Sequence, residues 1–547
     1  MSETADGPDS GIFGDLGRER AIILGGLMFG MLLGAIDQSI VSTALPTIVG
    51  ELGEASKLSW VVTAYLITVT ATTPLYGKLS DLYGRSIIYE ISIGVFLVGS
   101  ALSGLAGDIP GLEQYVSPMT QLALFRALQG VGAGGLIAMA TTILGDIFSP
   151  RERGKYMSYM MVIFGAATVG GPLLGGYLTD QFSWRWIFYI NVPVGLAAIL
   201  IAHFEIDLPV PSETHEIDYL GAVLLVVAVS ALMLVTTWGG TKYAWDSEQI
   251  VALAAASVVF AALFVYQELR VEEPVFPVHL LSRRTVVGVV GISLCLGAGM
   301  FGATIYLPVF LQTVLGASAT NSGLLLLPLV GGMIVTSALT GQLMTRLGHY
   351  KPFTVTGTVL GTAGFWLLHT MGPATTHLES TGYMILTGMG IGFIMPTLTI
   401  AAQNAVDRKN LGVVTTSVTF SRSLGSSIGV AVLGAILTNQ LQNRLADAFP
   451  AGAGGQVSSG GSIDPDTIAA LPPGIKSIVQ TAIANSIDTV FLVGVGILAV
   501  AFLIALALPH AELSEEAHVD VGEGAPTSAI PDDNEGAEPG ASAESHD

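Results

Sequence analysis

Two charged residues lie inside long apolar runs, and their side chains suit proton chemistry. Asp37 interrupts the first run and Arg126 interrupts the fourth. Burial disfavours an ionised carboxyl group and a nearby cation favours it, so an acid in this setting can bind and release a proton. Because arginine does not realistically deprotonate, Arg126 needs a partner. We predict that the two residues couple; a pair that only neutralises charge and orders the packing is the alternative.

A second charged group lies between the second and third apolar runs, in the segment Gly77-Lys-Leu-Ser-Asp-Leu-Tyr-Gly-Arg85. Asp81 can attract the positive end of a helix from elsewhere in the chain. Arg85 can pair with Asp146, and Arg422 is a second possible partner for Asp81 or Asp146. We predict that these contacts hold one side of the molecule shut. The alternative for the bases is that they only set membrane topology.

An echo of this segment occurs 264 residues later, where Gly341-Gln-Leu-Met-Thr-Arg-Leu-Gly-His349 repeats both glycines and a leucine at matched spacing. A loop that recurs between corresponding apolar hairpins indicates a duplicated membrane bundle.

The elements that must position these residues are membrane helices. Hydrophobic residues make up 51% of the 547-residue chain and charged residues 12%, against roughly 25% charged in an ordinary soluble domain. Apolar runs of about 20 residues recur, each long enough to cross a bilayer as a helix. We predict an all-α polytopic membrane protein with fourteen helices near 21–45, 58–77, 86–107, 118–145, 155–179, 186–204, 217–238, 249–267, 286–314, 323–345, 352–371, 381–404, 410–438 and 484–508.

Lysine and arginine in the predicted loops set the orientation. If the N-terminus is cytoplasmic, the inner loops carry fourteen bases and the outer loops five, so we predict that both termini are cytoplasmic. The position of the repeat indicates two six-helix bundles with two helices inserted between them. The predicted parts are a cytoplasmic acidic tail at 1–20, bundles at 21–204 and 286–508, inserted helices at 217–267, an extracellular loop at 439–483 and a disordered acidic cytoplasmic tail at 509–547.

Small and polar residues inside the runs are further candidates, with ordinary packing as the alternative for each. The fifth run carries small residues around a proline, which suits close contact between helices. These residues are Gly165, Gly170, Gly171, Pro172, Gly175 and Gly176. The polar residues that could face a central cavity are Gln38, Gln129, Tyr306, Gln312, Gln403 and Asn404.

Several chemistries have no support in the sequence. It contains no nucleotide-binding loop, no zinc-ligand spacing and no nucleophile elbow. We therefore expect a protein that is not an enzyme and that needs no metal and no cofactor. Cys295 is the only cysteine and cannot form an intramolecular disulfide.

Four segments carry a family resemblance: residues 77–85, Ala35–Pro46, Leu124–Gly130 and Gly165–Gly176. In this order they resemble the fourteen-helix drug:proton antiporter family of the major facilitator superfamily, over roughly residues 20–508. The resemblance implies a proton-driven exporter of hydrophobic or cationic drugs and other small molecules, working by alternating access in a bacterial plasma membrane. The antiport direction rests on the resemblance at Gly165–Gly176 alone.

Two other functions stay open. A glycine- and aromatic-rich bundle would equally serve export of an endogenous lipid or metabolite. A membrane sensor or scaffold that moves nothing is the second alternative, and the acidic tail would suit it. For a transporter we expect a small-molecule cargo, protons and the lipid bilayer as partners, no nucleic acid, and a monomeric chain.

Overall fold

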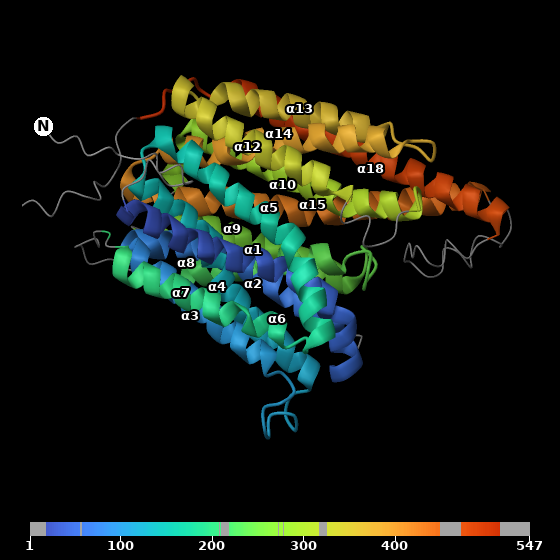
Figure 1. The fold of residues 1–547 in the computed structure, drawn as a ribbon, viewed down its shortest axis with the longest axis horizontal. Coiled ribbons are helices and arrows are strands. Elements are labelled where there is room, and N and C mark those ends of the chain that lie inside the picture. The colour runs from blue at the N-terminus through green and yellow to red at the C-terminus, as the bar shows by residue number, and fades with distance from the viewer. Residues whose placement is uncertain are drawn as a thin grey trace, which may run out of the picture.

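The computed structural model (Figure 1) describes residues 18–54, 57–206, 208, 218–271, 273–276, 278–316, 325–448 and 472–514. The predicted acidic tails fall almost entirely outside these residues. Long helices that run roughly side by side make up nearly all of the described chain.

Two six-helix halves and an inserted pair make up the fold. The first half contains α1 (Arg18–Leu52), α2 (Leu58–Tyr83), α3 (Arg85–Gly104), α4 (Pro118–Ile147), α5 (Pro150–Gln181) and one bent span made of α6 (Trp186–Tyr189) and α7 (Asn191–Glu205). The inserted pair is α8 (Tyr219–Trp238) and α9 (Glu248–Glu268). The second half contains α10 (Arg284–Thr313), α12 (Leu327–Leu347), α13 (Lys351–His369), α14 (His377–Asn404), α15 (Leu411–Ala448) and α18 (Pro473–Ala507).

The fourteen predicted segments each have a helical counterpart. Thirteen spans within the described residues are long and apolar enough to cross a membrane. The fourteenth segment is α13, whose glycines and threonines make it less apolar. The all-α membrane fold with two inserted helices is therefore confirmed.

The halves lie one against the other, as Figure 1 shows with the second half in yellow-green to red and the first in blue to green. Two seams join them: α2 packs against α15, and α5 packs against α12. The inserted α8 contacts α9, α2 and α15, so it lies along the first seam.

Several predicted boundaries are wrong. The segment at 77–85 is not a loop, because α2 continues to Tyr83 and only Gly84 breaks the helix, with φ of 95°. The predicted loop at 439–483 is partly helical, since α15 extends to Ala448 and α18 already begins at Pro473. Residues 439–448 contain no glycine or proline, so the helix can continue beyond the apolar run. The rest of that loop, 449–471, lies outside the described residues.

Candidate functional site

A central cavity of about 850 Å³ lies between the halves. Helices α1, α2, α4 and α5 supply its walls on one side, and α10, α14 and α15 on the other. The volume is within the range that drug-sized ligands occupy. The lining reaches Gln442 near one end of α15, so the cavity extends toward the end of the molecule opposite Gly84.

The cavity wall is apolar and adaptable. Methionine is flexible and polarisable, which suits ligands of varied shape. Seven methionines line the cavity: Met31, Met157, Met160, Met161, Met233, Met300 and Met395. Aromatic side chains add flat apolar area: Tyr65, Phe164, Trp245, Phe301 and Tyr306. No aspartate or glutamate occurs among the described residues of the lining.

The inserted pair contributes to this wall. Met233 and Thr237 of α8 line the cavity, together with Trp245 from the turn between α8 and α9. The indole of Trp245 packs against Gly239 and Gly240, where a Cβ would lie within 3.0 Å of the ring. Helix α8 and the turn after it are therefore part of the cavity wall, and α8 also covers one seam.

A buried polar cluster surrounds Asp37 in the first half. Arg126 Nη1 donates to Asp37 Oδ2 at 2.7 Å, and Gln129 Nε2 donates to Asp37 Oδ1 at 2.8 Å. Arg126 Nη1 also donates to Gln129 Oε1 at 2.8 Å, and Asn191 Nδ2 reaches Asp37 Oδ1 at 3.5 Å. Asp37 and Gln129 are 0% exposed and Arg126 is 2% exposed. The carboxylate is thus neutralised and hydrogen-bonded at membrane depth.

Tyr65 connects this cluster to the cavity. The guanidinium carbon of Arg126 lies 4.0 Å from the centroid of the Tyr65 ring, a cation–π contact. Tyr65 is also part of the cavity wall, and so is Gln38, the neighbour of Asp37 in the chain. Through Tyr65 the Asp37–Arg126 pair is therefore in direct contact with the cavity wall.

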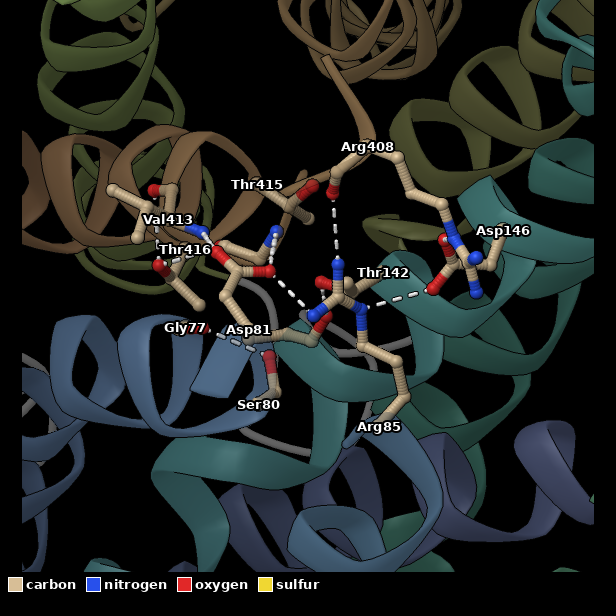
Figure 2. A network of polar contacts seen from close by, with 12 residues as sticks. Gly77, Ser80, Asp81, Arg85, Thr142, Asp146, Arg408, Val413, Thr415 and Thr416 are labelled. Carbon is tan, nitrogen blue, oxygen red and sulfur yellow. Dashed lines mark hydrogen bonds and ion pairs between the residues drawn. The ribbon is translucent and has the colours of Figure 1, made fainter. Parts of the chain in front are cut away.

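At the end of the molecule that carries Gly84, here called the closed end, Asp81 binds the second half (Figure 2). Its Oδ1 accepts from Gly412 N at 3.0 Å and its Oδ2 from Val413 N at 2.9 Å. These amides belong to the first turn of α15, where free N–H groups and the helix dipole favour an anion. The predicted attraction of Asp81 to a helix of the other half has this geometry.

Arg85 is the centre of the same network. It forms ion pairs with Asp81 and, through Nε at 2.9 Å, with Asp146 Oδ2. Its Nη2 donates to the backbone oxygen of Arg408 at 3.0 Å, and Arg408 Nε lies 3.3 Å from Asp146 Oδ1. Figure 2 shows how these side chains link α2, α3 and α4 to the start of α15.

The second seam is fastened at the same end. A capping box of Ser149 and Glu152 starts α5 and presents arginines in its first turn. Arg151 Nε donates to Thr345 O at 2.5 Å, and Thr345 Oγ1 donates back to Arg151 O at 3.1 Å. Thr345 belongs to α12, so this reciprocal contact joins the two halves.

Glycines explain why the sequence repeat occurs where it does. Gly77 of α2 faces Gly412 of α15, and Gly341 of α12 faces Gly154 of α5. A Cβ on any of these four glycines would lie closer than 3.0 Å to backbone of the facing helix. Gly77 and Gly341 are the matched first glycines of the repeat, so each copy allows one tight seam at the closed end.

The polar contacts at the opposite end hold each half together internally. Arg185 Nε pairs with Asp108 Oδ2 at 2.9 Å, and its other nitrogens bind Glu51 and the backbone. Burial lowers the pKa of Arg185, but Glu51 and Asp108 outweigh it and raise that pKa overall. Gln480 Nε2 donates to Thr313 O at 3.0 Å within the second half. Because each of these contacts lies within one half, none of them closes the cavity between the halves at this end.

The structure contradicts some predicted placements. Arg422 contacts neither Asp81 nor Asp146. It lies in the cavity wall, about two and a half turns along α15 from Val413, which binds Asp81. Of the predicted cavity residues, Gln38 and Tyr306 line the cavity, whereas Gln129 belongs to the Asp37 cluster. Gln312 is not among the lining residues.

Two further predicted cavity residues lie at the closed end. Gln403 Nε2 donates to Thr141 O at 3.1 Å, and Asn404 Nδ2 donates to Glu512 O at 3.1 Å. Both follow Pro396 by about two turns of α14, toward the loop. A polar residue in an apolar run could occupy any depth or face, and the run alone does not tell which.

The glycines of α5 have separate neighbours. Gly165 faces Ile334 and Val330 of α12 in the other half. Gly171 and Gly175 face α1, where a Cβ would meet Ser39 and Ile40. A Cβ at Gly170 or Gly176 would meet nothing within 4 Å. Of these five glycines, only Gly165 therefore lies against the other half.

Three residues of these polar clusters are not predicted from the sequence. Asn191 is not among the residues predicted from the sequence, although an asparagine in an apolar run two residues before Pro193 is a usable signal. Arg408 and Arg153 are among the fourteen bases predicted for the inner loops and have no further predicted role, although Arg153 is 0% exposed and donates to Gln403. Among the described residues, no group of three His, Cys, Asp or Glu side chains could hold a metal ion.

Comparison with known proteins gives the family. The model of the Major Facilitator Superfamily matches residues 27–430. Multidrug transporter protein MdtP of Bacillus subtilis (strain 168) is 35% identical over 91% of this chain and 94% of its own length. Multidrug resistance protein 3 of the same organism is 35% identical over 85% and 91%. The solved proton:xylose symporter XylE has the same fold, with a TM-score of 0.56 at 14% identity over 90% of this chain and 96% of its own.

Proposed function

Because the chain belongs to the major facilitator superfamily, we propose that it is a proton-driven exporter of hydrophobic small molecules that works by alternating access. The observation that carries the proposal is the buried Asp37–Arg126 pair, which shares Tyr65 with the wall of the cavity. The names of the Bacillus relatives, both multidrug transporters or resistance proteins, support export of drugs as the activity.

Protonation of Asp37 is the step that would couple proton and cargo. In the ionised state Asp37 holds Arg126 at 2.7 Å and keeps the guanidinium neutralised. When a proton binds to the carboxylate, Arg126 loses its counter-charge in a dry environment and must rearrange. Tyr65 lies directly against Arg126, so the cavity wall would change with the proton. By linkage, cargo that contacts Tyr65 would in turn change how tightly Asp37 binds the proton.

The contacts at the closed end would form and break as the transporter alternates between two conformations. Asp81, Arg85 and Asp146 join the halves while the cavity reaches the other end, so this conformation offers cargo an exit at that end only. Transport requires these contacts to break as the seam at the opposite end closes. With the orientation predicted from lysine and arginine, the closed end is cytoplasmic and the cavity faces outward.

The cavity wall favours a hydrophobic cargo. Its methionines and aromatic rings bind apolar bodies of varied shape. The described lining offers no carboxylate to a cation, so the cationic part of the predicted cargo class has no counter-charge in this wall.

The test is export of a neutral hydrophobic dye from proteoliposomes under an imposed pH gradient. The wild type should export dye only with the gradient, and Asp37→Asn should bind dye but fail to couple it to protons. Glu90→Gln is the matched control, because Glu90 is an intramembrane acid in the same half that contacts His203 rather than Arg126. Gradient-driven export that survives Asp37→Asn would overturn the role of Asp37, and equal export without a gradient would overturn antiport.

A further inference from the structure

Arg422 is the single charged side chain among the described residues that line the cavity. It lies in α15, and its guanidinium makes no hydrogen bond or ion pair with any described residue. Ser426 Oγ donates to the backbone oxygen of Arg422 at 2.8 Å and leaves the guanidinium group without a partner among the described residues. An arginine in the wall of an apolar cavity is thus left without a counter-charge.

Other arginines at membrane depth or at the seams do have partners. Arg126 pairs with Asp37, Arg85 pairs with Asp81 and Asp146, and Arg153 donates to backbone and to Gln403. A cation away from bulk water is unfavourable unless something neutralises it. The described residues that surround Arg422 in the cavity wall supply no such group, so we infer that the partner comes from the cavity.

We propose that the cavity binds amphiphiles that carry one anionic group, a carboxylate or a phosphate, and that Arg422 binds this group. The guanidinium suits both anions because its fork of N–H donors matches their paired oxygens. The proposal rests on the proposed function to the extent that the cavity is the cargo site, and it narrows the cargo to hydrophobic acids.

The surroundings of Arg422 fit an anionic head with an apolar body. Thr419 and Ser426 lie three and four residues from Arg422 on the same face of α15, and both line the cavity. Their hydroxyl groups can accompany a charged head. The wall that the first half supplies carries four methionines and the rings of Tyr65 and Phe164, which suit the body of the ligand. One molecule could therefore satisfy the cation and the apolar wall together.

Binding of matched amphiphiles to the purified full-length protein tests this directly. Three probes share one alkyl chain and one fluorophore but end in a carboxylate, a neutral amide or a trimethylammonium group, and anisotropy in neutral-lipid nanodiscs gives each Kd. The wild type should bind the carboxylate at least about tenfold more tightly than the amide. Arg422→Gln should abolish this preference while still binding the amide, and Arg422→Lys should keep part of it.

Arg444→Gln is the control, since it removes the same charge from the same helix at a position outside the cavity lining. It should keep the wild-type preference. Equal affinities for all three probes in the wild type would overturn the proposal, and so would a carboxylate preference that survives Arg422→Gln. Because no proton gradient is involved, these results are independent of whether dye export is proton-coupled.

Competition then separates two sources of the anion. Displacement of the carboxylate probe by phosphatidylglycerol but not by phosphatidylcholine would assign the site to a lipid head group. Displacement by a soluble hydrophobic acid alone would assign it to free acids. If neither phosphatidylglycerol nor the soluble acid displaced the carboxylate probe, even in large excess over the probe, the anion site would be contradicted.

Discussion

Two arginines, one in each half, lie well inside the bundle in opposite circumstances. Arg126 in α4 is bound by Asp37 and Gln129 and covered by the ring of Tyr65. Arg422 in α15 faces the cavity and has no partner among the described residues. The same side chain is therefore part of a closed internal cluster in the first half and an open position in the second.

This difference separates two uses of a buried charge. A charge whose counter-charge is built into the chain responds to protonation of that partner, because the proton changes the balance within the protein. A charge without a built-in partner responds to what enters the cavity. Tyr65 contacts Arg126 and also lines the cavity that Arg422 faces. The paired and the unpaired arginine therefore both border on the same cavity, Arg126 through Tyr65 and Arg422 directly.

The largest effect is expected from Arg126→Met. The substitution leaves the Asp37 carboxylate buried with only amide donors, and removing one partner of a buried pair destabilises by about 3–5 kcal/mol. Chemical unfolding in mixed micelles, followed by tryptophan fluorescence, measures the loss. The double variant with Asp37→Leu should recover much of it, because the two changes are coupled. A loss no larger than that of Arg422→Met would break the comparison.

Arg85→Met sharpens the comparison with a third arginine, whose partners link the two halves. Loss of its charged hydrogen bonds should weaken the closed end by about 1.5–3 kcal/mol, which moves molecules toward a conformation open at that end. Distances between spin labels at the exposed Tyr83 and Leu347, one from each half, report the change.

Lys78→Gln is the control from the same segment, because Lys78 Nζ lies 3.7 Å from Glu273 in the connection after α9. Its distance distribution should stay that of the wild type. If Arg85→Met left the distribution unchanged as well, the network in Figure 2 would not hold the halves together.

Arg422→Met should change the free energy of unfolding by less than about 1 kcal/mol, or raise it, because no partner is lost and an unpaired cation is removed. The same unfolding experiment measures it beside Arg126→Met. A loss of several kcal/mol would mean that Arg422 has a structural partner, and the assignment of a ligand site to it would fall. Arg444→Gln again serves as the control for loss of charge from α15.

The sequence predicts the fold well because apolar runs of membrane length leave the backbone few choices. It also predicts the pairing of Asp37 with Arg126, because two isolated charges inside apolar runs have few other partners. It fails for Arg422, since a run of small and apolar residues does not tell which face of α15 meets the cavity. The same limit misplaced Gln403, whose depth depends on where α14 ends rather than on residue type.

The smallest effect is expected at the exposed pair of Lys57 and Glu54, which lies between α1 and α2. Lys57 Nζ contacts Glu54 Oε1 at 3.1 Å, and Ser117 Oγ donates to Glu54 Oε2 at 2.6 Å. The Ser117 hydroxyl and then Lys57 lower the pKa of Glu54, so any stabilisation is present above the ordinary carboxyl pKa and is lost as the pH falls below it. Water screens this pair, so Glu54→Gln should melt with the wild type at neutral pH and in acid alike. A clear difference at neutral pH that vanishes in acid would show that an exposed pair also stabilises this protein, and a loss in Arg126→Met could then no longer be assigned to the burial of its pair.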